Sequence, residues 1–166
     1  MTFIVDGRWQ GPVVDQHIHL DTSNRYLSAI EEFVRKGGTG IVLVHKPNFS
    51  GKLPIDKDGY RQAYSETISM AEEVRNKFAI KVALALGPHP VVWEKQISDL
   101  GIEKSTELHL DSIDLALDLI EQGKAHCLGE VGRPHYQVNE QTWRHSNENL
   151  TQIMAEAASA KVPIQL

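Results

Sequence analysis

The sequence predicts an α/β protein with a parallel sheet built from repeated strand–helix units. Short apolar runs rich in β-branched residues alternate with longer amphipathic segments along the chain. The runs are apolar at consecutive positions, as expected of strands that helices cover. Parallel strands need crossover connections, and the amphipathic segments supply them. We expect a single domain over residues 1–166, with about four and a half strand–helix units.

Five apolar runs mark the expected strands. They are Pro12–Leu20, Thr39–Pro47, Ala79–Pro90, Ala125–Gly132 and a last run that begins at Val162. Helical spacing of apolar residues predicts the connecting helices. The first helix covers residues 24–36, and the second runs from an Asp58 N-cap to Phe78. A later helix covers residues 112–122 and ends before Gly123, and the last follows an Asn139 N-cap. Residues 91–108 could form a further short helix.

Composition excludes several classes of protein. The 17 Lys and Arg against 22 Asp and Glu give a formal charge of −5, which argues against a broad, sequence-independent nucleic-acid binder. Cys127 is the single cysteine, so no disulfide can form within the chain. We find neither a signal peptide nor an apolar run long enough to span a bilayer, and therefore expect a soluble cytoplasmic protein.

Ionisable residues stand at the ends of the first and fourth runs, where parallel sheets bind ligands. Asp15, His17 and His19 are two residues apart, so regular alternation places them on one face. Two imidazoles on one face can bind one cation, although two hydrogen-bonded histidines would look the same. Glu130 is an acid in an apolar run, which is costly unless it is bound to a metal or paired, for example with Arg133.

Other polar residues follow the strands. His89, held between two prolines, is predicted to bind substrate or to hydrogen-bond its own loop. Arg133 and His135 are the candidates for a phosphate contact, with plain loop residues as the alternative. His45 and Lys46 either face an anion or are solvated. Of the remaining histidines, His126 is predicted to be structural, and His109 and His145 are assigned no chemistry.

Three motifs together carry a family resemblance. DQHIHL, LGPHP and GEVGRPHY occur in this order, each at a strand end. The set resembles the TatD-type metal-dependent hydrolases, which are TIM-barrel members of the amidohydrolase-like group. The resemblance implies that His17, His19 and Glu130 bind one or two divalent ions (Zn, Mg or Mn), that Glu130 is also catalytic, and that His89 contacts substrate. It further implies hydrolysis of phosphodiester bonds, as in DNA, by metal-activated water.

The resemblance also implies a barrel of eight units, with further ligands beyond the fifth strand. The chain corresponds to the N-terminal portion of such a barrel, so we expect poor activity of this chain alone and a homo-oligomer that covers its open edges. Two alternatives remain. One is a non-catalytic metal-binding or assembly module with the same fold, and the other is an open, doubly wound flavodoxin-like sheet.

Overall fold

The computed structural model describes residues 3–166 and contains one parallel sheet of four strands. The strands are β3 (Val14–Ile18), β4 (Gly40–Val44), β5 (Lys81–Leu86) and β6 (Cys127–Leu128). They lie side by side in their chain order, and every neighbouring pair is parallel. A flavodoxin-like sheet would place its first strand between later ones. The sequential order therefore excludes the doubly wound alternative and agrees with part of a TIM-barrel-like fold.

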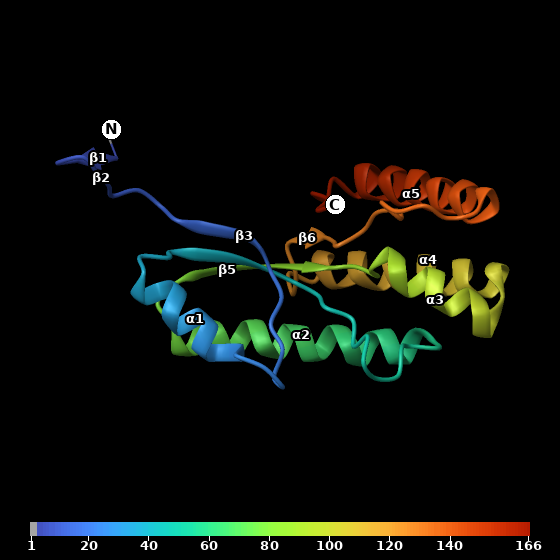
Figure 1. The fold of residues 1–166 in the computed structure, drawn as a ribbon, viewed down its shortest axis with the longest axis horizontal. Coiled ribbons are helices and arrows are strands. Elements are labelled where there is room, and N and C mark those ends of the chain that lie inside the picture. Colours follow the sequence, from blue (N-terminus) through green and yellow to red (C-terminus); the bar gives the residue numbers. More distant parts are fainter. Residues whose placement is uncertain (1–2) are drawn as a thin grey trace.

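Helices connect successive strands, as the alternating pattern predicts. They are α1 (Tyr26–Arg35), α2 (Lys57–Lys77), α3 (Pro90–Leu100), α4 (Ile102–Glu121) and α5 (Glu140–Ala160). Helix α4 packs against both α2 and α5. Figure 1 shows α1 and α2 along one side of the sheet and α5 on the other side of the molecule, beside the C-terminus. None of the described helices is long and apolar enough to cross a membrane.

The last apolar run makes a fifth, very short parallel connection. Ile164 forms a single bridge with Leu128. The backbone N–H of Leu128 donates to the carbonyl of Pro163 at 2.9 Å, and the N–H of Gln165 donates to the carbonyl of Leu128 at 2.8 Å. Residues 163–165 therefore continue the sheet in chain order beyond β6.

The core lies between the sheet and the helices. Alternate strand residues fill it, and Leu43, Leu84, Leu86 and Leu128 have no exposed surface. Burying one such side chain contributes roughly 1.5–3 kcal/mol. The intervening positions on the opposite face are smaller or only partly buried, as at Ala83. This division of faces fixes which side chains can reach a site at the strand ends.

Two boundaries differ from the sequence prediction. The N-cap of α2 is Asp56, whose Oδ1 accepts a hydrogen bond from the N–H of Gly59 at 2.8 Å. Asp58 lies in the first turn instead, where a carboxylate still favours the positive end of the helix. Helix α4 begins at Ile102, ten residues before the predicted apolar stretch, and its first half meets α3 where the Trp93 Nε1–H donates to the Thr106 hydroxyl at 3.0 Å.

A hairpin precedes the sheet and was not predicted. Strands β1 (Ile4–Val5) and β2 (Arg8–Trp9) pair antiparallel around Asp6 and Gly7, both at positive φ. Positive φ at both central residues is the geometry of a type I′ turn. Figure 1 shows the hairpin projecting away from the body of the molecule.

Candidate metal centre

A bulge interrupts β3 between Asp15 and Ile18, next to His17 and His19. Asp15 pairs with Ile41 and Ile18 pairs with Leu43, so three steps along β3 match two along β4. Such an irregularity bends a strand and redirects its side chains. The simple alternation predicted for Asp15 and the two histidines is therefore broken. The Asp15 Oδ1 atom accepts a hydrogen bond from the backbone N–H of His17 at 3.0 Å.

Glu130 is held where three backbone segments meet. The N–H of Gly129 donates to the carbonyl of Leu86 at 2.9 Å, and the N–H of Val131 donates to the carbonyl of Gln165 at 3.1 Å. A Cβ atom at Gly129 would stand only 2.7 Å from the carbonyl oxygen of Gln165. The missing side chain thus lets residues 163–165 approach, and backbone hydrogen bonds of Gly129 and Val131 hold the main chain on both sides of Glu130.

His17, His19 and Glu130 come together at the carboxyl end of the sheet. Their candidate ligand atoms all lie within 4.8 Å of one another. The Nε2 atoms of the two histidines are 3.2 Å apart, and Glu130 Oε2 lies 3.2 Å from His17 Nε2 and 3.8 Å from His19 Nε2. Ligands of a tetrahedral ion about 2.1 Å away are separated by roughly 3.4 Å. The spacing of the three atoms therefore fits one divalent ion.

The hydrogen bonds of His19 place a lone pair on its outer nitrogen, which lies 3.2 Å from His17 Nε2. His19 Nδ1 lies 3.0 Å from the carbonyl oxygen of Val44, which can only accept. The ring proton therefore sits on Nδ1, and Nε2 carries a lone pair. A ligand histidine whose second nitrogen donates to a backbone carbonyl is a common arrangement at metal sites.

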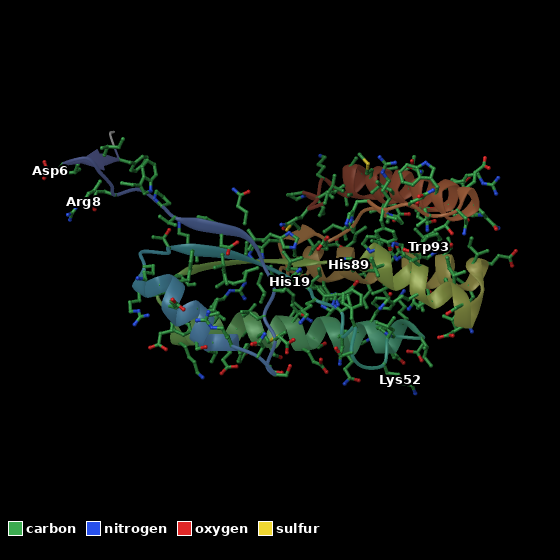
Figure 2. The ribbon with its side chains drawn as sticks, in the orientation of Figure 1. Asp6, Arg8, His19, Lys52, His89 and Trp93 are labelled. Carbon is green, nitrogen blue, oxygen red and sulfur yellow. The ribbon has the colours of Figure 1, made fainter. Side chains whose placement is uncertain are left out.

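His89 approaches the same carboxylate from the loop after β5. Its Nδ1 accepts the backbone N–H of Val91 at 3.1 Å, which caps α3, so its proton sits on Nε2. That nitrogen lies 3.6 Å from Glu130 Oε1. Burial lowers the pKa of His89, while the charge of Glu130 opposes this shift. His89 is thus a neutral N–H donor beside the cluster, and Figure 2 shows it near His19 at the middle of the molecule.

His45 is buried, which corrects the expectation of a solvated or anion-facing side chain. It is 4% exposed, and its Nδ1 lies 2.8 Å from the hydroxyl of Thr67 on α2. Burial, with smaller effects from His19 and His89, lowers the pKa of His45 to about 4. Lys46, the next residue, forms an ion pair with Asp21.

Arg133 and His135 lie on the loop after Glu130. The Arg133 guanidinium donates to Asn147 Oδ1 at 2.8 Å and lies over the Trp143 ring, 4.4 Å from its centroid. His135 packs edge-on against Tyr136. Both side chains are exposed, and none of these contacts is with His17, His19 or Glu130. A phosphate contact by either residue stays a prediction.

An open cleft begins at Leu20, the residue that follows the cluster member His19. It has a volume of about 950 Å³ and lies between the loops that follow β3 and β4 and the adjoining face of α2. Phe49, in its lining, packs edge-on against His89. Its charged lining consists of three carboxylates and one ammonium group, from Asp21, Glu66, Glu73 and Lys46. The net charge of this lining therefore disfavours a long polyanion.

Sequence reasoning missed one residue at the site. Gln165 Nε2 lies 2.9 Å from His17 Nδ1 and 2.7 Å from the carbonyl oxygen of Gln16. A glutamine in a short apolar run carries no spacing signal. Only the curvature that brings residues 163–165 across to β3 reveals this contact.

Comparisons with known proteins bear on the family and the fold. The family model for TatD related DNase matches residues 14–166. The uncharacterized protein MJ1127 of Methanocaldococcus jannaschii is 29% identical over 158 residues, which are 93% of this chain and 54% of that protein. The crystal structure of an uncharacterized amidohydrolase from Saccharomyces cerevisiae has a similar fold, with a TM-score of 0.51 at 15% identity over 92% of this chain and 47% of that one. The chain thus spans about half the length of both.

Proposed function

Because the chain belongs to the family of TatD-related DNases, we propose that its His17, His19 and Glu130 bind a divalent ion and serve the hydrolysis of phosphodiester bonds. The observation that carries this proposal is the meeting of the three ligand atoms within 4.8 Å. Two imidazoles and one carboxylate suit zinc or manganese better than magnesium, which prefers oxygen ligands.

Glu130 and His89 would have different roles around such an ion. A bound ion would supply an acidified water and screen the phosphoryl charge. Glu130 turns Oε2 toward the histidines and Oε1 toward His89. The carboxylate therefore joins the ligand cluster to the substrate side, which supports its catalytic assignment. The Nε2–H group of His89 is placed to donate to a phosphoryl oxygen.

Charge disfavours a long polyanion as substrate. The chain has a formal charge of −5, and the cleft beside the cluster carries more carboxylates than ammonium groups. Binding of long DNA relies on many Lys and Arg contacts to phosphates. We therefore propose a small phosphodiester, or the end of a nucleic-acid strand, as the group that reaches this site.

Calorimetric titration with Zn²⁺ and Mn²⁺ tests the metal site. We expect binding by the unaltered chain and its loss in the His17→Ala, His19→Ala double variant. His126→Ala is the matched control, because this exposed histidine lies at the opposite end of β6, where its Nδ1 accepts the N–H of Leu84. Unchanged binding in the double variant would refute the assignment.

A second candidate is a metal-binding or assembly module without turnover. It is favoured by the large exposed apolar side chains beside the sheet edges, Val14 and Leu166. We propose that these edges pair in a homo-oligomer. Metal binding that is lost in the double variant, without phosphodiester hydrolysis by any assembled form, would indicate this function.

A further inference from the structure

Gln165 links the last strand segment to β3 through a single amide group. Its Nε2 atom lies 2.7 Å from the carbonyl oxygen of Gln16 and 2.9 Å from His17 Nδ1. A backbone carbonyl can only accept a hydrogen bond. The amide atom between the two partners must therefore be the NH₂ group, which has one hydrogen for each of them.

This contact determines where His17 carries its proton. Because the Gln165 NH₂ donates to His17 Nδ1, that nitrogen is an acceptor and the ring proton sits on Nε2. The Nε2–H group then donates to the unprotonated Nε2 of His19 at 3.2 Å, and it also lies 3.2 Å from Glu130 Oε2. His19 has the opposite tautomer, with its proton on Nδ1 toward Val44. His19 thus has a lone pair on Nε2 that an ion can bind, whereas Nε2 of His17 carries a proton.

An ion bound through His17 Nε2 would conflict with the Gln165 contact. His17 would then carry its proton on Nδ1, where it would meet the NH₂ donor of Gln165. Turning the amide over would instead place Oε1 against the carbonyl oxygen of Gln16, acceptor against acceptor. Gln165 cannot satisfy both partners once His17 is a ligand through Nε2.

We propose that Gln165 is a positioning residue that holds His17 in the metal-free tautomer, so that binding of a divalent ion requires Gln165 to release His17. The inference rests on the proposed metal site. It assigns the two histidines unequal roles, with His19 as the ready ligand and His17 as the ligand that is recruited. Removing the amide should therefore strengthen ion binding, the reverse of what a supporting residue would do.

The first experiment reads the tautomers directly. Long-range ¹H–¹⁵N NMR of the unaltered, metal-free chain should show His17 protonated at Nε2 and His19 protonated at Nδ1. In Gln165→Leu, which keeps a similar side-chain size without a donor, the preference of His17 for Nε2–H should weaken. A His17 that carries its proton on Nδ1 in the unaltered chain would overturn the proposal, whether or not the chain binds an ion.

The second experiment measures Zn²⁺ affinity by calorimetry. We expect Gln165→Leu to bind on the order of three- to tenfold more tightly, the effect of about one net hydrogen bond. The gain in Zn²⁺ affinity should vanish when His17→Ala is added, since Gln165 then has no imidazole to hold. Gln152→Leu is the control, because this glutamine on α5 donates to Glu156. Unchanged or weaker Zn²⁺ binding in Gln165→Leu would refute the proposed role of Gln165. Equal binding by the unaltered chain and the His17→Ala, His19→Ala variant would refute the metal site itself.

Discussion

Gly87 and Gly129 touch across neighbouring strand ends, directly before the candidate ligand Glu130. A Cβ atom on Gly87 would stand 3.0 Å from the backbone nitrogen of Gly129. On its other side, Gly129 approaches Gln165 just as closely. Side chains are excluded here because three backbone segments converge. The position of Glu130 therefore depends on two residues that have no chemistry of their own.

Gly129→Ala should displace residues 163–165 or Glu130. Its Cβ would stand 2.7 Å from a backbone oxygen, which cannot move aside like a flexible side chain. We expect a loss of about 1–3 kcal/mol in the free energy of unfolding, as for overpacking of a core, together with weaker divalent-ion binding.

Gly132→Ala is the matched control for this substitution. Its Cβ would meet only Pro90 Cγ at 3.8 Å, an ordinary contact. Urea unfolding and calorimetry on both variants make the comparison. Equal behaviour of the two variants would contradict the proposed role of the close approach.

His89 should have two separable roles. As the N-cap of α3 it accepts the N–H of Val91, and loss of a cap costs about 0.5–2 kcal/mol. His89→Ala should lose this stability, whereas His89→Asn should largely keep it because asparagine is a good N-cap. Both should bind inorganic phosphate more weakly in the presence of Zn²⁺, since the Nε2–H donor is gone. Full phosphate binding by His89→Asn would limit His89 to capping.

The stability of the chain should fall in mildly acidic solution because of His45. Burial lowers its pKa from 6.5 to about 4. Between these values the unfolded chain binds a proton at this residue and the folded chain does not, so the free energy of unfolding rises with pH across the window. From about pH 7.5 to about pH 5, this one group should remove about 2 kcal/mol.

The substitution His45→Asn isolates this effect. Urea unfolding at the two pH values should show a smaller acid loss in His45→Asn than in the unaltered chain. The exposed His135→Asn serves as control. An acid loss that is the same in all three proteins would show that other groups cause it.

The sequence predicted the helices and parallel strands well because apolar periodicity reports burial directly. His17, His19 and Glu130 could be grouped because parallel strands share one carboxyl end. The hairpin was missed although Asp6 and Gly7 form a strong turn signal, since its strands contain only two residues each. The burial of His45 and the contact of Gln165 with His17 depend on how the sheet curves. Local sequence patterns do not report this curvature.

The chain alone should hydrolyse a phosphodiester poorly. Its three clustered ligands suffice for one ion, whereas two-metal catalysis holds a second ion about 3.5–4 Å away. Release of nitrophenolate from bis(p-nitrophenyl) phosphate with added Mn²⁺ or Zn²⁺ should stay near the rate of the Glu130→Gln variant. Robust metal-dependent turnover that Glu130→Gln abolishes would contradict this expectation and would show that the described residues are sufficient.

The purified chain should form dimers or larger assemblies. Within residues 3–166, β3 has a paired neighbour on one side alone, and Ile164 makes a single bridge. Val14 is 49% exposed and Leu166 is 71% exposed, so association would cover apolar surface as well as unpaired backbone. Light scattering should show a concentration-dependent mass that falls in the Val14→Lys, Leu166→Lys variant. Met154→Lys is the control, because this exposed apolar residue lies on helix α5 and not on a strand. A monomer at every concentration would contradict this prediction and would mean that contacts within the chain, such as the Gln165 amide on the Gln16 carbonyl, already cover the edges.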